Sequence, residues 1–477
     1  MSARREKLSD ATSETVGASQ QSLTALPGGW VWSCLGDICR TTSGGTPSRK
    51  HASYFAGNIP WVKSGELPDG VVTDVEECIT EEAVKNSSAK LFPAGTLLIA
   101  LYGATVGKLG ILKHEATTNQ AVCAIFPSGH LDTKYLFWYL RCARSTLVAQ
   151  AVGGAQPNIS QGILRTLPIP VAPLDQQKRI VAEIEKQFSR LDEGINNLKR
   201  VKANLKRYKA AVLKAAVEGR LVETEAEIAK REGRNFETGA QLLQRILETR
   251  RSQWTGRGKY KEPAAADTTD LPELPEGWVW VSVEQTALII SGLTKNPKRE
   301  ALPSKYPYLR VANVYANELR LNEIEYIGVA ESELGKLLLQ RNDLLVVEGN
   351  GSPDQIGRVA LWDGSISNCV HQNHIIKVRF SDVSLPKWVM NWLLSPGGRH
   401  QIERVSSSTS GLHTLSTGKV SCLPVPLPPI AEQHRIVAEV DRRLSLIRKA
   451  EAQVAANLQR AERLRQAILR RAFANAP

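Results

Sequence analysis

Apolar and polar residues alternate along this chain in patterns that predict both strands and helices. Short apolar runs such as Thr96–Gly103 and Asp343–Gly351 end in glycine or asparagine, which predicts buried strands that enter turns. The segments 132–152 and 385–395 have the spacing of helices. These segments predict two mixed α/β regions, which we call the first and second heads.

Two longer segments carry a narrow apolar stripe with nearly heptad spacing. The first begins near Pro173 and Asp175 and ends at Gly219, and the second begins near Pro429 and Glu432. Proline and an acid in the first turn and glycine after the last turn are typical of helix ends. At about 1.5 Å per residue, a helix of about 45 residues spans roughly 65–70 Å. We expect each stripe to pack against the other. The stripes comprise Ile184, Phe188, Leu191, Ile195, Leu198, Val201, Leu205, Tyr208 and Val212, and then Val440, Leu444, Ile447, Val454, Leu458, Ala461, Leu464 and Ile468.

Two sequence motifs each occur twice in the chain. "LPGGWVW" at 26–32 returns as "LPEGWVW" at 274–280, an offset of 248 (274 − 26). "LPIPVAPLDQQKRIVAEI" at 167–184 returns as "LPVPLPPIAEQHRIVAEV" at 423–440, an offset of 256 (423 − 167). This period is too long for a solenoid and indicates a duplicated unit of head plus helix. The two copies match well at their ends and poorly in the middle. This pattern favours two heads that bind different targets over a duplication that is kept only for packing.

These boundaries predict the organisation of the chain. The polar N-terminus lacks the apolar region of a secretory signal, so we expect a disordered tail. "EPAAADTTDLPE" has the composition of a linker. The expected parts are a tail at 1–22, the first head at 23–172, a coiled-coil helix at 173–222, additional helices and a linker at 223–273, the second head at 274–429 and a C-terminal coiled-coil helix at 430–477.

Composition narrows the class of partner. The 477 residues require several domains, and no apolar run approaches the length of a membrane span. A net charge of +13 and a pI near 9.4 favour an anionic partner, most commonly nucleic acid. Residues 174–220 hold 12 basic and 6 acidic side chains and residues 430–477 hold 10 and 5, so the helices carry most of the excess. The seven cysteines show no CxxC spacing and predict reduced, buried thiols of a cytosolic protein.

The segment "GATVGKL" at Gly103–Leu109 is similar to the end of a phosphate-binding P-loop but does not meet its requirements. A P-loop has four residues between its glycines and a hydroxyl residue after the lysine, whereas here three residues intervene and leucine follows Lys108. We therefore expect no nucleotide binding. The second head keeps Gly357 and Arg358 at this place, and a turn followed by a cation suits a DNA phosphate. A solvated surface turn is the alternative.

The other sequence patterns give no indication of catalysis. His371 and His374 are three residues apart, which on a strand places them on opposite faces, so joint metal ligation is not expected. The sequence contains no GxSxG, no GxGxxG and no [DN]PP[YFW] motif. We expect no catalytic residue, no metal and no cofactor on this chain.

Several segments have the chemistry that DNA contacts require. Hydroxyls and cations in "TTSGGTPSRK" suit phosphates, together with its backbone amides. Amide side chains after strands can pair with adenine, although they also commonly satisfy loop backbone. The candidates in the first head are Ser43, Gly44, Gly45, Thr46, Ser48, Arg49, Lys50, Lys63, Tyr102, Lys108, Asn119, Gln120, Gln156 and Asn158. Those in the second head are Thr294, Lys295, Arg310, Asn313, Asn350, Arg358, Gln372, Asn373, Ser410, His413 and Thr414. On the helices, the candidates for partner docking are Arg179, Lys206, Arg207 and Arg435, with a solvated surface as the alternative.

The order of these motifs resembles that of the specificity subunits of type I restriction–modification systems. The shared features are "LP.GW.W" at the start of each head, "GGTPS" at 44–48, "GATVGK" at 103–108, "QPNIS" at 156–160 and "Q.RIVAE" at the start of each long helix. The similarity covers nearly all of residues 26–473. The second head departs from the pattern, with "SGLTKNP" and "GLHTLS" in place of "SGGTPS" and "QPNIS".

The resemblance implies an α+β fold with internal pseudo-two-fold duplication, in which two target recognition domains are joined by two long antiparallel coiled-coil helices. Each head would read one half of a bipartite, asymmetric site in double-stranded DNA. The helices would set the spacing and dock two methyltransferase subunits and, through them, restriction subunits. S-adenosylmethionine, ATP and Mg would bind to those partners, in a bacterial or archaeal cytoplasm.

Two other functions stay open from the residues alone. A non-catalytic coiled-coil adapter with protein-binding heads would show no salt-dependent binding to DNA. An autonomous enzyme would transfer methyl groups without a partner subunit.

Overall fold

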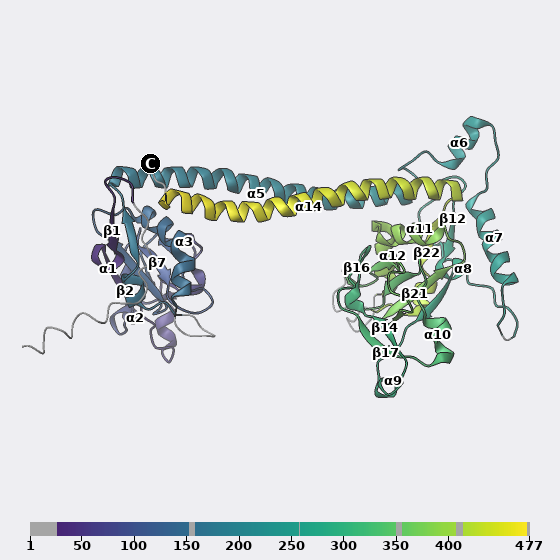
Figure 1. Ribbon diagram of the computed structural model, residues 1–477, viewed down its shortest axis with the longest axis horizontal. Helices are drawn as coiled ribbons and strands as arrows, with labels where there is room; N and C mark the ends of the chain where they lie inside the picture. Colours follow the sequence, from purple (N-terminus) through teal and green to yellow (C-terminus); the bar gives the residue numbers. More distant parts are fainter. Residues whose placement is uncertain (1–25, 152–157, 257, 350–354, 407–413, 475–477) are drawn as a thin grey trace, which may run out of the picture. The chain divides into compact units, whose positions relative to one another are not determined.

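The computed structural model describes residues 26–151, 158–256, 258–349, 355–406 and 414–474, and it divides into two compact units (Figure 1). The first unit contains the chain up to residue 198 and from residue 456, and the second contains residues 199–455. Each unit holds one head and one end of each long helix. Among the described residues, no helix combines the length and the apolar character that a membrane span requires.

The first head contains a mixed sheet, a smaller sheet and a two-stranded ribbon. The mixed sheet has the order β2-β10-β7-β8-β4, the smaller sheet has the order β5-β3-β9-β6, and β1 pairs with β11. The elements are β1 (Val31–Cys34), α1 (Leu35–Ile38), β2 (Cys39–Ser43), η1 (Ala52–Phe55), β3 (Ile59–Val62), η2 (Ser64–Glu66), β4 (Gly70–Val72), β5 (Cys78–Ile79), α2 (Glu81–Lys85), β6 (Leu91–Phe92), β7 (Leu97–Ala100), β8 (Leu109–Leu112), β9 (Ala116–Thr118), β10 (Val122–Pro127), α3 (Thr133–Ala149), α4 (Gln161–Arg165), β11 (Pro168–Val171) and α5 (Leu174–Val217).

The second head repeats this plan. Its sheets have the orders β13-β21-β18-β19 and β17-β14-β20, while β12 pairs with β22 and β15 with β16. The elements are α6 (Glu225–Glu232), α7 (Gly239–Ser252), β12 (Val279–Ser282), α8 (Val283–Thr286), β13 (Ala287–Ser291), α9 (Pro297–Glu300), β14 (Lys305–Leu309), η3 (Val311–Asn313), β15 (Val314–Tyr315), β16 (Glu318–Leu319), β17 (Glu325–Gly328), α10 (Glu331–Leu337), β18 (Leu344–Val347), β19 (Val359–Leu361), β20 (Val370–His371), β21 (Ile375–Phe380), α11 (Leu385–Leu394), α12 (Pro396–Ser406), α13 (Thr417–Ser421), β22 (Pro424–Leu427) and α14 (Ile430–Ala474). The predicted fold class is confirmed.

The central strand of each main sheet is buried on both faces, which explains its uninterrupted apolar sequence. In β7, Leu97 and Ile99 belong to the core beside α3, whereas Leu98 and Ala100 belong to a second core on the opposite face. In β18, the residues of one face, such as Leu344, pack in the core with α11, and those of the other face pack in a separate core. Both strands match the segments predicted from the sequence.

The repeated "GW" motif is bonded to the first turn of the long helix. The indole of Trp30 donates to Gln176 Oε1 at 2.7 Å, and the indole of Trp278 donates to Glu432 Oε1 at 3.1 Å. The motifs at the two ends of each repeat therefore match because they meet in space.

The long helices pack against each other in antiparallel fashion inside each unit. In the first unit, Ile184 and Phe188 of α5 share a core with Leu469 and Phe473 near the end of α14. In the second unit, the last turns of α5 share a core with the first turns of α14, represented by Ile436. The stripe is interrupted at Val201 and Tyr208, which are 43% and 48% exposed.

The prediction that Leu464 belongs to the stripe is wrong. Leu464 is 47% exposed, and Arg465 takes the inward position, where it pairs with Asp192 and lies over the ring of Phe188. The spacing after Ala461 is four residues rather than three, which moves Arg465 and then Leu469 onto the buried face.

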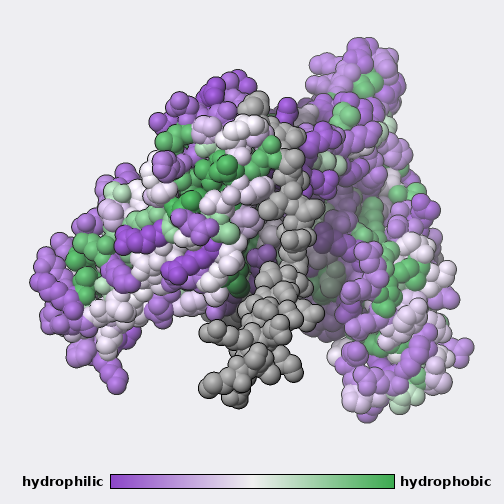
Figure 2. Space-filling model, turned by 60° about the vertical axis from the view of Figure 1, so that its left-hand side comes forward, coloured by the Kyte–Doolittle hydropathy of each residue, from purple (hydrophilic) through white to green (hydrophobic). Residues whose placement is uncertain are grey.

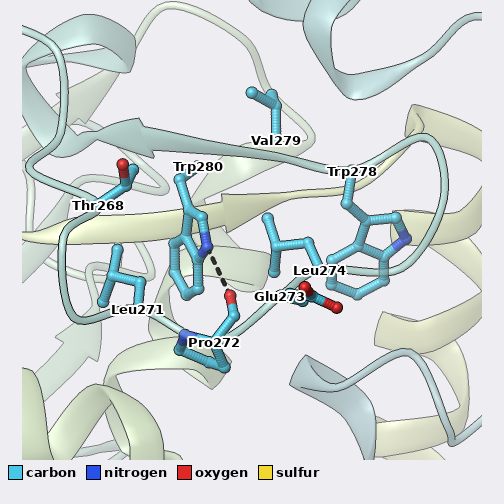
Figure 3. Close-up of a pocket in the computed structure, with 8 residues that line it drawn as sticks. All are labelled: Thr268, Leu271, Pro272, Glu273, Leu274, Trp278, Val279 and Trp280. Carbon is cyan, nitrogen blue, oxygen red and sulfur yellow. Dashed lines mark hydrogen bonds between the residues drawn. The ribbon is translucent and has the colours of Figure 1, made fainter.

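The segment between the long helix and the second head forms two short helices. Thr238 caps α7, whose buried residues Leu242 and Ile246 belong to the core of the second head. The linker that follows lies beside β12 and lines an open hollow of about 530 Å³ (Figure 3). There the indole of Trp280 donates to the carbonyl oxygen of Pro272 at 3.1 Å, which attaches the linker to the head.

The expectation that all cysteines are buried is wrong for four of the seven. Cys34 and Cys422 are exposed, and Cys78 and Cys142 are half-buried. Cys34, Cys78 and Cys422 lie at or directly beside the ends of short elements, whereas Cys142 lies within α3. All seven are free thiols. Burial raises the pKa of the thiols of Cys39, Cys123 and Cys369 to about 12.

Candidate nucleic-acid interface

Four segments that the sequence predicted to contact DNA meet beyond one end of the main sheet in the first head. They are residues 43–46, 101–102, 118–122 and 158–161. Backbone hydrogen bonds join them in series: Gly44 N to Val122 O at 3.1 Å, Gly45 N to Thr118 O at 2.9 Å, Leu101 N to Ala121 O at 2.8 Å and Ile159 N to Leu101 O at 2.7 Å. Because these bonds extend the sheet, they fix the positions of the polar side chains that the segments carry.

The polar side chains of these segments form one cluster. The hydroxyl of Thr46 and that of Tyr102 both lie beside the amide of Gln120, which is exposed. Asn158 forms a β-bridge with Tyr102. Ser43 Oγ accepts a hydrogen bond from Gln161 Nε2 at 2.6 Å. Sequence reasoning missed Gln161, whose only signal is its place at the start of α4, directly after the capping residue Ser160.

The second head brings the equivalent segments together in the same way. Leu293 N donates to His371 O at 2.8 Å, and Gln372 N donates to Leu309 O at 2.9 Å. Leu415 N donates to Glu348 O at 2.7 Å, as Ile159 N does to Leu101 O in the first head. The predicted residues Thr294, Asn373 and Thr414 lie in these segments. Four predicted residues, Gln156, Asn350, Ser410 and His413, lie outside the described residues.

The structure corrects the role expected for Gly44 and Gly45. We expected their backbone amides to meet phosphates, but both residues are buried and both amides donate to carbonyls of neighbouring segments. A Cβ on Gly45 would overlap the backbone of Ser88 and Ala89, and one on Gly44 would overlap Thr118. These glycines permit close approach of the chain rather than ligand contact.

Two predicted contacts of the second head are also corrected. Asn313 is 3% exposed, and its Nδ2 donates to the carbonyls of Arg320 and Glu323 at 2.8 and 2.9 Å. Arg358 is 9% exposed, lies over the ring of Tyr315 and donates to the carbonyl of Val311 at 3.2 Å. Both are held inside the head, so we remove them from the candidate interface.

In each head, an arginine on a helix holds one turn by a hydrogen bond. This turn precedes Lys108 in the first head and its counterpart Arg358 in the second. In the first head, Arg144 Nε donates to Gly107 O at 2.8 Å, and its guanidinium makes a two-fold ion pair with Asp69. In the second head, Arg399 donates to Ile356 O at 2.6 Å. Lys108 is half-buried, and within the described residues it has no acidic partner. Neither arginine was predicted.

Four predicted cations pair with acids, two of them in each head. Arg49 and Lys63 both contact Glu77, and Lys295 and Arg310 both contact Glu325. Of the remaining candidates, Ser48 and Lys50 are exposed at the surface beside Arg49, and Asn119 is half-buried. Hydrophilic residues dominate the face seen in Figure 2, with small hydrophobic patches between them.

The helix candidates differ in their surroundings. Arg179, Lys206 and Arg207 are exposed. Arg435, in contrast, is half-buried and pairs with Glu225 of α6 at 2.6 Å, so it attaches α6 to the long helix. We therefore remove Arg435 from the candidate docking surface.

His371 and His374 are separated by a turn and not by strand alternation as expected. His371 ends β20 with its side chain fully buried, and its Nδ1 lies 2.9 Å from the carbonyl oxygen of Ile375. His374 is exposed and pairs with Glu348 at 3.1 Å.

Burial lowers the pKa of His371 to about 4, below the value of about 6.5 for an exposed histidine. The unfolded chain therefore binds this proton more readily, so the stability that the neutral ring contributes is complete above pH ~6.5 and is lost as the pH falls toward 4. We expect this site to reduce the free energy of unfolding by about 2 kcal/mol between pH 7 and pH 5. Urea unfolding of wild type and His371→Asn at both pH values measures it. An equal pH dependence of the free energy of unfolding in wild type and His371→Asn would contradict the assignment.

The fold defines a protein with two heads of the same architecture, each with polar side chains on equivalent bonded segments. The sequence profile of the family described as "Type I restriction modification DNA specificity domain" matches residues 27–205 and again 275–456. The chain belongs to this family and contains its domain twice.

Named relatives agree with this family, and solved structures share the fold. The EcoKI specificity subunit of Escherichia coli K12 is 23% identical over 458 residues, which cover 94% of this chain and 89% of that protein. The EcoR124I/EcoR124II specificity subunit of Escherichia coli is 33% identical over 181 residues, which cover 37% of this chain and 45% of that protein. The HsdS subunit of Thermoanaerobacter tengcongensis has the same fold, with a TM-score of 0.54, 18% identity and coverage of 96% of this chain and 100% of that one. A chain from a structural study of type I R-M complex assembly gives a TM-score of 0.64 with 19% identity, over 95% of this chain and 100% of that one.

Proposed function

We propose that this chain is the subunit that selects the DNA sequence in a type I restriction–modification complex, and that each head reads one half of a bipartite, asymmetric site. The observation that carries the proposal is the equivalent polar surface of the two heads. Both place hydroxyl, amide and cationic side chains on segments fixed by the same backbone hydrogen bonds, but the residues themselves differ. A common frame with different side chains is what two different half-sites require.

The contacts proposed for each head follow from exposure and position. In the first head they come from Ser43, Thr46, Ser48, Arg49, Lys50, Lys63, Tyr102, Lys108, Asn119, Gln120 and Asn158. In the second head they come from Thr294, Lys295, Arg310, Gln372, Asn373 and Thr414. The amide side chains suit adenine edges, and the cations suit phosphates.

The long helices are proposed to set the spacing and to dock the partners. Each runs unbroken from one unit into the other, and α5 with 44 residues is about 66 Å long at about 1.5 Å per residue. A stiff connection of two weak half-site contacts raises overall affinity through effective concentration. The exposed cations Arg179, Lys206 and Arg207 are proposed for docking two methyltransferase subunits, through which restriction subunits join.

The reaction is proposed to take place on the partners, in the cytoplasm of a bacterium or an archaeon. The methyltransferase subunits would hold S-adenosylmethionine and methylate adenine N6, and the restriction subunits would use ATP and Mg. A base inside a duplex must be flipped out before it is methylated, so the heads would position the DNA while the partner reacts with it.

The test is to co-express the full chain with a methyltransferase subunit of a type I system and to map methyladenine in the genome of the expressing cells. We expect one split, asymmetric sequence with a constant gap, and binding to that sequence that weakens steeply with salt. A protein-binding adapter would be favoured if the methylated positions followed no split sequence. It would also be favoured if the complex showed no salt-dependent binding to DNA. Methyl transfer by the chain alone would show that it is an enzyme.

A further inference from the structure

Both heads contain the same arrangement of one glutamate between two cations. In the first head, Arg49 Nη1 lies 2.7 Å from Glu77 Oε2, and Lys63 Nζ lies 3.1 Å from Glu77 Oε1. In the second head, Lys295 Nζ lies 3.4 Å from Glu325 Oε2, and Arg310 Nη1 lies 2.8 Å from Glu325 Oε1. In each head the two oxygens of one carboxylate are shared between two cations, and in the first head Lys63 Nζ also lies 2.8 Å from Glu76 Oε2. We call these the Glu77 triad and the Glu325 triad.

The two triads occupy equivalent places in the fold. Lys63 directly follows β3, and Arg310 directly follows the corresponding strand β14. The backbone carbonyl of Glu77 accepts a hydrogen bond from the backbone N–H of Trp61 at 2.9 Å, and Glu325 is the register partner of Tyr308 in the β14–β17 pair.

An aromatic side chain connects each triad to the DNA-facing segment. The indole of Trp61 donates to Gly45 O at 3.0 Å, and the hydroxyl of Tyr308 donates to Leu293 O at 2.7 Å. The strand beside each triad, β3 or β14, is therefore also bonded to the segment proposed to contact DNA.

The identity of the cations differs between the heads while the glutamate is the same. The cation that directly follows the strand is Lys63 in the first head and Arg310 in the second. The other cation is an arginine in the first head and a lysine in the second. The glutamates lie in the poorly matched middle of the repeat, so their common position comes from the structure and not from a shared motif.

The stability of the heads does not explain why these glutamates are present. The side chains of Glu77 and Glu325 are 30% and 40% exposed, and those of Arg49 and Lys295 are 57% and 55% exposed. Ion pairs that are exposed to this extent contribute little to stability. The guanidinium of Arg49 is also held over the ring of Phe55 at 4.1 Å, which positions this cation whether or not Glu77 is charged. The two cations lower the pKa of Glu77, so it is ionised at neutral pH.

We propose that Glu77 and Glu325 each occupy the place of a DNA phosphate in the unbound head and thereby limit sequence-independent binding to DNA. A carboxylate and a phosphate present similar pairs of oxygens to a cation. A duplex that offers only phosphates must displace the glutamate to reach the two cations, whereas base contacts on the cognate site offset that cost. This inference rests on the proposed function, because it assumes that the triads face DNA.

Removal of the glutamate charge is expected to strengthen binding to noncognate duplex. Each of Glu77→Gln and Glu325→Gln should raise the affinity about threefold to tenfold at low salt. Each should also make the plot of log affinity against log salt steeper by about one, because one further phosphate contact becomes available. The methylated sequence should stay the same, since neither glutamate reads a base.

The measurement is fluorescence anisotropy of a labelled duplex that lacks the recognised sequence, titrated across a salt series with the full chain bound to its methyltransferase subunit. Glu81→Gln and Glu276→Gln are the matched controls, because each removes one exposed negative charge from the same unit and neither side chain pairs with a cation of the triad. A general charge effect would give the same increase in the controls and would overturn the proposal. So would weaker binding by Glu77→Gln with unchanged thermal unfolding, since that result would make Glu77 a positioning residue for the cations.

The outcomes also separate this inference from the proposed function. If wild type shows no salt-dependent binding to any duplex, the proposed function fails and the triads with it. If wild type binds in that way and the triad variants match the controls, only the role of the glutamates is wrong.

Discussion

Exchanging residues 26–173 for the first head of another specificity subunit is expected to change one half of the methylated sequence completely and to leave the other half unchanged. The reason lies in the ends of the head. Strand β1 pairs with β11, from Val31 opposite Val171 to Cys34 opposite Pro168, so the chain enters and leaves the head at adjacent points. The exchange therefore cuts the chain at two neighbouring positions. Mapping methyladenine in cells that carry the chimaera measures the result.

The exchange must preserve the contacts between the head and the long helices. Tyr135 and Tyr139 both pack edge-on against Phe473 of α14 at 5.3 Å, and Trp138 packs against Phe188 of α5 at 4.9 Å. A head that keeps aromatic residues at these three places is the proper donor. As a control, the same exchange at 274–429 should change the other half alone. A chimaera that changed both halves would contradict independent reading by the heads.

Replacement of Gly45 by alanine is expected to abolish the contribution of the first head to DNA binding, at least a tenfold loss of affinity. The new Cβ would overlap backbone atoms of Ser88 and Ala89, which cannot move aside as a flexible side chain would. Relief requires the segment to shift, which breaks the bond from Gly45 N to Thr118 O and the bond from Trp61 to Gly45 O. Changes that strain the backbone in this way reduce the free energy of unfolding by about 3 kcal/mol.

Gly129→Ala is the matched control, because a Cβ at Gly129 meets no atom within 4 Å. Both variants are to be compared in binding to the recognised duplex and in thermal unfolding. Normal binding by Gly45→Ala would show that this segment does not shape the interface. Loss of binding with intact unfolding would place the effect in the site rather than in the stability of the head.

The fold was predictable because its determinants are local or repeated. Apolar runs such as Leu97–Ala100 gave the central strands, and helix-end residues near Pro173 and Gly219 bounded α5. Because the two heads come from one duplicated sequence unit, they were expected to share one architecture. The position of Arg465 was not predictable from a heptad pattern, because one four-residue step changes which side chains face inward.

The site was predictable as a set of segments but not as a set of contacts. The segments around Gly44 and Asn119 were both predicted to contact DNA, and a backbone hydrogen bond joins them, yet the burial of Gly44 depends on the approach of Thr118 from another strand. Asn313 and Arg358 have the side chains of DNA-binding residues, and only their environment shows that they satisfy backbone and pack on Tyr315. Glu77 gave no signal because its two partners lie 14 and 28 positions earlier in the chain (77 − 63 and 77 − 49).

The alternating prolines of the exit strands have a consequence for self-association. Pro168 and Pro170 have no N–H, and their carbonyls accept the hydroxyls of Tyr139 and Tyr135 at 2.6 and 2.7 Å. Pro424 and Pro426 accept indole N–H groups in the same way, at 2.7 and 2.6 Å. A two-stranded ribbon normally offers an open edge on which a strand of another molecule can add. Along β11 and β22 these positions offer neither a backbone donor nor a carbonyl without a partner, so a strand of another molecule cannot form its usual hydrogen bonds on that edge of either ribbon.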